Sequence, residues 1–292
     1  MKILLVSKFD LPDFMCDMIT HGLKSLFESD VIDINESWYL YSDFRNYWAD
    51  RVPSRGMEYG RGFTLYGKLP KLNIDRTDIE TKIKNHYFDK IIYGSIARCT
   101  KYLQLVLEYY KSNEIIFIDG EDDQNIRFQF VKIGTYFKRE LIYIKDEEYR
   151  IRVNPINFCI PKELIVKEIP KKEKDYATII PGDKSTYIYT EEKPYYEDYQ
   201  KSYFGVTSKK GGWDCLRHYE ILMNGCVPFF PGLEECPETT MTRFPKKLVL
   251  HSNELIKKGN DLSFYEEYVK VLLEHTRDFL TTESVAKGIL GI

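Results

Sequence analysis

Residues 211–230 read GGWDCLRHYEILMNGCVPFF, and this stretch predicts a loop, a helix and a strand in immediate succession. Paired glycines open it, and Gly225 ends the helical pattern before the apolar run 227–230, which is typical of a buried strand. The start of such a helix offers unpaired N–H groups and the positive end of the helix dipole. We therefore expect an α/β unit with an anion-binding loop at the start of its helix.

Arg217 and Glu220 lie three residues apart, so they share one helical face near that positive end. A cation and a carboxylate at this place suit a diphosphate and a ribose hydroxyl, which points to a nucleotide-sugar site. Gly211 and Gly212 would let the backbone approach the ligand closely. The competing interpretation is a solvated ion pair between Arg217 and Glu220, worth about a few tenths of a kcal/mol.

The surrounding sequence resembles the donor half of exostosin-like glycosyltransferases and is similar to the glycosyltransferase-like domain of spore-coat maturation proteins. The shared pattern begins with a Ser-x-Phe-Gly strand at residues 202–205 and continues through a glycine loop and an Arg-x-x-Glu helix. It ends with a Gly-Cys-x-Pro strand at residues 225–228, and the likeness covers residues 200–245. The resemblance implies a GT-B fold, in which two Rossmann-like domains flank a cleft and the second holds most of the nucleotide-sugar.

The resemblance also implies an activity, namely transfer of a sugar from a nucleotide-sugar, a UDP-sugar in this group, to a glycan or other hydroxyl acceptor. The transfer would invert the anomeric centre and need no metal or other cofactor. Arg217 would neutralise the leaving diphosphate, and Glu220 would hold the ribose hydroxyls. The expected donor-binding residues are Gly211, Gly212, Trp213, Arg217, Glu220, Lys184 and Lys210.

The rest of the chain predicts two α/β domains, because strand-like runs alternate with helical ones. The expected strands include residues 2–7, 31–34, 90–93, 114–118, 141–144 and 248–250. A proline- and lysine-rich stretch at 152–175 suggests a boundary. It would separate an acceptor-side Rossmann-like domain, residues 1–160, from the donor domain, residues 161–292. In GT-B proteins the final helix crosses back to the first domain, which here would be the helical segment 264–280.

The composition excludes several classes of protein. A net charge of −3 argues against a broad nucleic-acid or anionic-membrane surface. No apolar stretch approaches the roughly 20 residues that span a bilayer, and no secretory signal is visible. Six cysteines without metal spacing suggest reduced thiols and a cytoplasmic protein, unlike the membrane-anchored, lumenal members of the exostosin-like group. The abundance of Lys, Ile and Tyr resembles proteins from AT-rich genomes, including viral ones.

An acidic run, DGEDD at residues 119–123, follows a strand-like segment and should lie at the carboxyl end of its strand, facing the cleft. One carboxylate could be the general base, with Asp119, Glu121 and Asp122 as candidates. The run could instead bind a metal or simply cap a helix. His21 is a further candidate base, whereas His218 is expected to be a packing residue.

Lys138 and Arg139 are candidates for binding acceptor or diphosphate charge. The alternative is a solvated basic turn, or ion pairs with the 119–123 run. An aromatic-rich segment predicts either a sugar-stacking platform or core packing. Its rings are Trp38, Tyr39, Tyr41, Phe44, Tyr47, Trp48, Tyr59, Phe63 and Tyr66.

Two other functions remain open at the level of sequence. One is a non-catalytic protein of the same fold that binds a glycan or nucleotide. The other is a metal-dependent transferase or hydrolase centred on residues 119–123.

Overall fold

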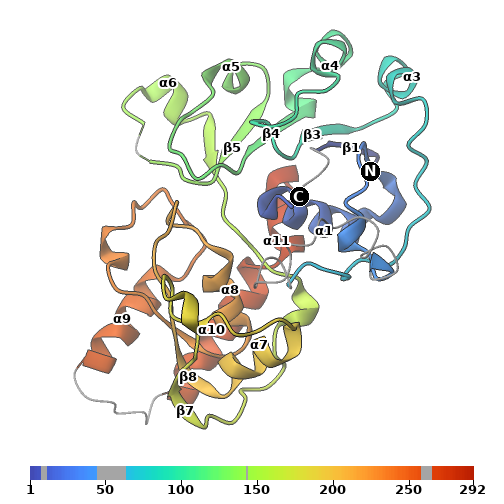
Figure 1. Ribbon diagram of the computed structural model, residues 1–292. Helices are drawn as coiled ribbons and strands as arrows, with labels where there is room; N and C mark the ends of the chain where they lie inside the picture. Colours follow the sequence, from blue (N-terminus) through green and yellow to red (C-terminus); the bar gives the residue numbers. More distant parts are fainter. Residues whose placement is uncertain (8–11, 45–63, 143, 258–264) are drawn as a thin grey trace.

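The computed structural model describes residues 1–7, 12–44, 64–142, 144–257 and 265–292 (Figure 1). The larger of its two sheets has the order β2-β1-β3-β4-β5-β6, and all its strands are parallel. Its strands are β1 (Ile3–Val6), β2 (Val31–Asp33), β3 (Lys90–Tyr93), β4 (Ile115–Asp119), β5 (Thr135–Lys138) and β6 (Val153–Pro155). The strand order reverses between β1 and β3, and ligands of open α/β sheets bind at such a point, outside the carboxyl ends.

Helices cover both faces of this sheet, which explains why its central strands β1, β3 and β4 are almost continuously apolar. Along β1, Ile3 and Leu5 join one buried cluster while Leu4 and Val6 join the other. The first cluster includes apolar side chains of α1 (Phe14–Phe27), and the second those of α3 (Ile79–Lys84) and α4 (Leu103–Tyr109). The short helices α5 (Phe128–Val131) and α6 (Glu147–Arg150) flank β5.

The smaller sheet has three parallel strands in the order β7-β8-β9. They are β7 (Lys174–Tyr176), β8 (Ser202–Val206) and β9 (Val227–Phe229). The crossover helices are α7 (Glu192–Gln200) and α8 (Leu216–Met223), followed by α9 (Lys246–Lys257) and α10 (Tyr265–Phe279). The stretch quoted first therefore does form loop, helix and strand. We call residues 161–281 the small-sheet part, and residues 1–160 with the last helix the large-sheet part.

The last helix, α11 (Thr282–Leu290), returns to the large-sheet part and packs against α1 (Figure 1). Ile160 N–H donates to Leu280 O at 3.0 Å, and Thr282 N–H donates to Ile160 O at 2.9 Å, so the turn into α11 is tied to the chain after β6. A Cβ on Gly22 of α1 would lie 2.1 Å from Thr282 O, so only glycine permits this close approach. The chain thus crosses back, but one helix later than expected.

The α/β prediction is confirmed, and three details of it are wrong. The segment 264–280 corresponds to α10, which packs against α8 of the small-sheet part instead of crossing back. Residues 248–250 lie within α9, because a short apolar run fits a buried helix as well as a strand. The strand β5 lies at 135–138, six residues before the expected strand at 141–144. None of the helices in the described residues is long and apolar enough to cross a membrane.

Candidate functional site

A cavity of about 380 Å³ lies between the two parts of the molecule. The large-sheet part contributes Phe14 after β1, Asp122 after β4, and Phe158. The small-sheet part contributes the loop after β8 and the first turn of α8, including Lys210 and Arg217. The cavity is therefore bordered by segments that follow the carboxyl ends of parallel strands, where α/β proteins bind ligands.

Arg217 is the least satisfied charged group in this cavity. Its Nε and Nη1 atoms are buried, and neither has a hydrogen-bond partner among the described residues. The guanidinium carbon lies 5.8 Å from the centre of the Tyr187 ring, which covers one side of it. A buried guanidinium that lacks an acceptor is unfavourable, so this position calls for an anionic ligand with paired oxygens.

Glu220, one turn further along α8, is only 2 % exposed and forms no ion pair with Arg217 in the described structure. Its carboxylate accepts hydrogen bonds from Thr64 Oγ1 at 2.6 Å and from Tyr195 OH at 2.5 Å. Burial raises the pKa of Glu220. Because Glu220 and two guanidinium nitrogens of Arg217 are buried, and the two residues form no ion pair in the described structure, the interpretation as a solvated surface ion pair does not hold. Each Glu220 oxygen retains a lone pair that could accept a further hydroxyl.

The glycine loop makes room for side chains of the large-sheet part. A Cβ on Gly212 would lie 2.3 Å from Glu140 Oε1, and one on Gly211 would lie 2.5 Å from Asp122 Oδ2. The N–H groups of Trp213 and Asp214 donate to the Glu140 carboxylate, each at 2.9 Å. These two N–H groups are therefore already occupied. Gly211 and Gly212 both line the cavity, but the two N–H groups that follow them point to Glu140 instead of to a ligand.

The acidic run separates into members with different surroundings. Asp119 is completely buried and accepts hydrogen bonds from Arg127, Tyr136 and Lys138 at 2.5, 2.5 and 3.1 Å. This network holds the end of β4 to β5, and Asp119 does not line the cavity.

The other two candidate bases also differ in their surroundings. Glu121 pairs with Arg98 at 2.7 Å, outside the cavity. Asp122 lines the cavity, with one carboxylate oxygen bound to Arg139. Among the three candidate bases, only Asp122 faces the space where a ligand could lie.

Lys138 and Arg139, the candidate acceptor-binding residues, are both buried and paired with carboxylates of the acidic run. This arrangement matches the alternative left open by the sequence, ion pairs with residues 119–123. Arg139 also donates to Asp214 O at 2.7 Å, which joins the two parts of the molecule.

Of the remaining candidate donor-binding residues, one lines the cavity and two do not. Lys210 lines the cavity, with Nζ 5.7 Å from the Tyr187 ring centre. Lys184, in a 3-10 turn, is exposed and does not line it. Trp213 is buried against Phe230, with ring centres 6.3 Å apart, and also lies outside the lining.

Both histidines of interest lie away from the cavity lining. His21 contacts Thr282 Oγ1 at 2.9 Å within the α1–α11 interface. Burial lowers the pKa of His218 to about 3, and its ring nitrogens contact Thr207 Oγ1 and Trp213 O. His218 is thus a neutral packing residue, as expected.

The aromatic segment is partly described. Tyr39, Tyr41 and Tyr66 are buried in the core of the large-sheet part, which favours packing over a sugar platform for these three. Four of the other rings named with them lie outside the described residues: Tyr47, Trp48, Tyr59 and Phe63. The described residues contain no cluster of three metal-ligating side chains.

The sequence did not single out several residues that build the site. Tyr187 and Tyr189 line the cavity, and their spacing in a Tyr-x-Tyr loop was the available signal. Glu140 and Thr64 gave no signal, because each acts on a partner more than 70 positions away in the sequence. Only the folded chain brings these pairs together.

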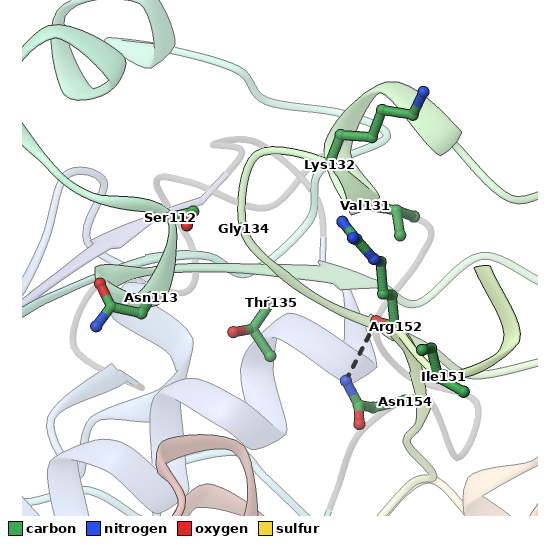
Figure 2. Close-up of a pocket in the computed structure, with 9 residues that line it drawn as sticks. All are labelled: Ser112, Asn113, Val131, Lys132, Gly134, Thr135, Ile151, Arg152 and Asn154. Atoms are coloured by element: carbon green, nitrogen blue, oxygen red, sulfur yellow. Dashed lines mark hydrogen bonds between the residues drawn. The ribbon is translucent and has the colours of Figure 1, made fainter. Parts of the chain in front are cut away.

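A second hollow, of about 340 Å³, opens at the amino ends of β4, β5 and β6 (Figure 2). Ser112, Asn113 and Thr135 line one side of it, and Arg152 the other, whereas Lys132 extends away from it in Figure 2. It lies at the amino ends of the strands, whereas the cavity lined by Arg217 lies near carboxyl ends. None of its lining side chains has a buried polar atom without a partner. The cavity lined by Arg217 is therefore the stronger candidate site.

No protein-family model matches the chain, and a comparison with curated proteins found no match. The assignment of the site therefore depends on its geometry.

Proposed function

We propose that this protein is a glycosyltransferase that moves a sugar from a nucleotide-sugar, a UDP-sugar by the exostosin-like resemblance, to a hydroxyl acceptor. The observation that carries the proposal is that Arg217 lines a cavity between two parallel α/β parts and has two buried guanidinium nitrogens without an acceptor among the described residues. Two parallel sheets facing a shared cavity are consistent with a GT-B arrangement.

The cavity offers groups for each portion of such a donor. Arg217 and Lys210 supply positive charge for a diphosphate, and charge that develops on it during departure would be stabilised there. Tyr187 and Tyr189 present rings against which a base or a sugar can pack. Glu220 retains acceptor capacity for ribose hydroxyls while Thr64 and Tyr195 hold it in place.

Asp122 is the residue we assign to proton removal. It lies across the cavity from α8, on the loop after β4, and Arg139 fixes one of its oxygens. The second oxygen would take the proton of the acceptor hydroxyl as that hydroxyl attacks the anomeric carbon. The bond from that carbon to the diphosphate breaks on the opposite face, towards Arg217, which gives inversion.

The first experiment is a thermal-shift screen against UDP, GDP, CMP and dTDP, with EDTA and with Mg²⁺. A ligand at 100 times its dissociation constant stabilises the folded state by about 2.7 kcal/mol. A shift with one nucleoside diphosphate that EDTA does not change supports the proposal. No shift with any nucleotide contradicts it, and a shift only with Mg²⁺ favours a metal-dependent enzyme.

A turnover assay then separates an enzyme from a binding protein of the same fold. With the stabilising donor and a panel of glycan acceptors, the wild type should release nucleoside diphosphate. Asp122→Asn should bind the donor normally and turn over at least about 100-fold more slowly, the usual scale for a general base. Donor binding without any diphosphate release from the wild type would identify a non-catalytic protein.

A further inference from the structure

Four charged side chains meet where the glycine loop touches the large-sheet part, and we call this group the clasp. Its members are Asp122, Arg139, Glu140 and Asp214. Three of them, Arg139, Glu140 and Asp214, are at most 3 % exposed. Buried charges in such number persist only when each has a partner. Arg139 forms ion pairs with Asp122 and Glu140, and the Asp214 carboxylate accepts hydrogen bonds from Phe158 N–H and Tyr219 OH.

The side chain of Glu140 holds the backbone of the glycine loop in place. Its two carboxylate oxygens accept the N–H groups of Trp213 and Asp214, and Arg139 donates to the carbonyl of Asp214. Lys210 N–H donates to Gly212 O at 3.0 Å, which closes the loop on itself. The backbone of residues 212–214 is therefore fixed by the large-sheet part.

Asp214 carries this constraint into α8. Its Oδ2 accepts the N–H of Phe158 at 2.7 Å, and its Oδ1 accepts the hydroxyl of Tyr219 at 2.6 Å. Tyr219 lies in α8, two residues after Arg217. A continuous chain of hydrogen bonds thus runs from Glu140 through the loop to the helix that bears the unsatisfied guanidinium.

Glu140 itself is absent from the cavity lining, while Gly212 and Asp214 belong to it. The loop therefore turns two of its N–H groups away from the cavity and towards Glu140. Anion binding in this cavity must then depend on side chains, chiefly Arg217 and Lys210. The direction in which those side chains point becomes the property that the clasp controls.

We propose that Glu140, supported by Arg139, is a positioning residue that fixes the glycine loop and thereby aims Arg217 and Lys210 at the phosphates of the ligand. Only the identity of the ligand rests on the proposed function. The contacts themselves exist in the described structure without it.

The test compares Glu140→Gln with a matched control, Glu147→Gln. Glu147 also pairs with an arginine at 3.1 Å, the distance of the Arg139–Glu140 pair, but its side chain is exposed. Glutamine keeps the size of the Glu140 side chain but replaces one carboxylate oxygen by an NH₂ group. That group cannot accept a hydrogen bond from the backbone N–H group that faces it. We expect amide hydrogen exchange of Trp213 and Asp214 to accelerate at least tenfold in Glu140→Gln only.

Two further measurements report on Arg217. The Nε–Hε NMR signal of Arg217 should shift in Glu140→Gln, and the affinity for inorganic pyrophosphate should fall about tenfold. Unchanged exchange at residues 213 and 214 overturns the proposal, and so does faster exchange with an unchanged Arg217 signal. If the wild type binds neither pyrophosphate nor a nucleoside diphosphate, the proposed function fails, while exchange and the Arg217 signal still decide the role of Glu140.

Gly212→Ala provides an independent variant in case Glu140→Gln does not fold. It retains every charge and forces a Cβ to within 2.3 Å of Glu140 Oε1, so the loop must move. The same acceleration of exchange and the same change in the Arg217 signal are expected. A folded Gly212→Ala protein with wild-type behaviour in both measurements would contradict the proposal.

Discussion

Two groups of buried charge lie close to the same cavity, and they differ in how they are satisfied. Around Asp119, every charged atom has a partner, since Arg127, Tyr136 and Lys138 surround one carboxylate. Around Arg217, two guanidinium nitrogens have no partner in the described residues. Because a buried charge needs compensation, the first group is complete without a ligand and the second is not. Burial of a charge alone therefore does not indicate a candidate site, whereas a buried charged group without a partner does.

The comparison predicts opposite outcomes for mutations in the two groups. Removing a member of the complete group should damage the fold, and removing Arg217 should damage binding. The following experiments test that contrast, from the largest expected effect to the smallest.

Asp119→Ala should lower the free energy of unfolding by about 3–5 kcal/mol, because it removes the nearer carboxylate partner of buried Lys138 and leaves only Asp123, at 3.8 Å. Urea unfolding followed by circular dichroism would measure it. The control is Asp30→Ala, whose exposed pair with Lys2 at 2.6 Å should contribute less than about 1 kcal/mol. Equal effects for the two variants would remove the distinction between the buried network and a surface pair.

Asp214 connects the clasp to α8 and makes stability depend on pH. Burial, partly offset by Arg139, raises the pKa of Asp214 from 3.8 to about 6. The folded state then binds its proton more tightly than the unfolded state, so stability falls as pH rises from 3.8 through 6. Each pH unit that separates the folded and unfolded pKa values corresponds to about 1.36 kcal/mol, so the loss amounts to about 3 kcal/mol.

The measurement is urea unfolding of the wild type and of Asp214→Asn at several pH values from about 3 to 7, which bracket the titration. The wild type should lose stability relative to the variant as pH rises, because the asparagine takes up no proton. Buried Asp17 and Glu220, whose pKa values burial also raises, contribute equally to both proteins and cancel in the difference. A constant difference across this range would show that Asp214 titrates normally.

The sequence predicted the parts of the molecule that local patterns determine. Residues 211–230 were expected to form a loop, a helix and a strand, and the glycines, the helix start and the strand at 227–229 are all present. Local patterns also predicted that His218 would be a packing residue, since adjacent helical positions do not share a face.

The partners of these residues were not predictable, because they depend on contacts between distant segments. Nothing near Gly212 indicates that Glu140 will occupy the space of its missing side chain. Asp119, Glu121 and Asp122 look alike in sequence, and only the neighbouring β5 and Arg98 decide which carboxylate remains at the cavity. Sequence thus identified a cluster, and the tertiary structure separated its members.

Arg217→Ala should change binding while leaving stability nearly intact. We expect donor affinity to fall by about 1.5–3 kcal/mol, the scale of hydrogen bonds to a charged group. The free energy of unfolding should change by less than about 1 kcal/mol, since no described partner loses a hydrogen bond to Nε or Nη1.

Isothermal titration with the nucleotide that stabilises the wild type would give both affinities. Arg217→Lys is the matched variant, because it keeps the charge and loses the planar, bidentate donor, so its affinity should lie between the two. An Arg217→Ala protein that binds like the wild type, or unfolds as readily as Asp119→Ala, would reverse the assignment of the two groups.

Glu121→Gln should have the smallest effect, although Glu121 lies two residues from Asp119 in the same acidic run. Its pair with Arg98 is partly exposed to solvent, and such pairs contribute about 0.2–1 kcal/mol. Urea unfolding should therefore detect a loss below about 1 kcal/mol, and nucleotide affinity should remain that of the wild type. A large loss of turnover in this variant would move the general base from Asp122 to Glu121. It would also show that the cavity lining is a poorer guide to catalysis than position in the acidic run.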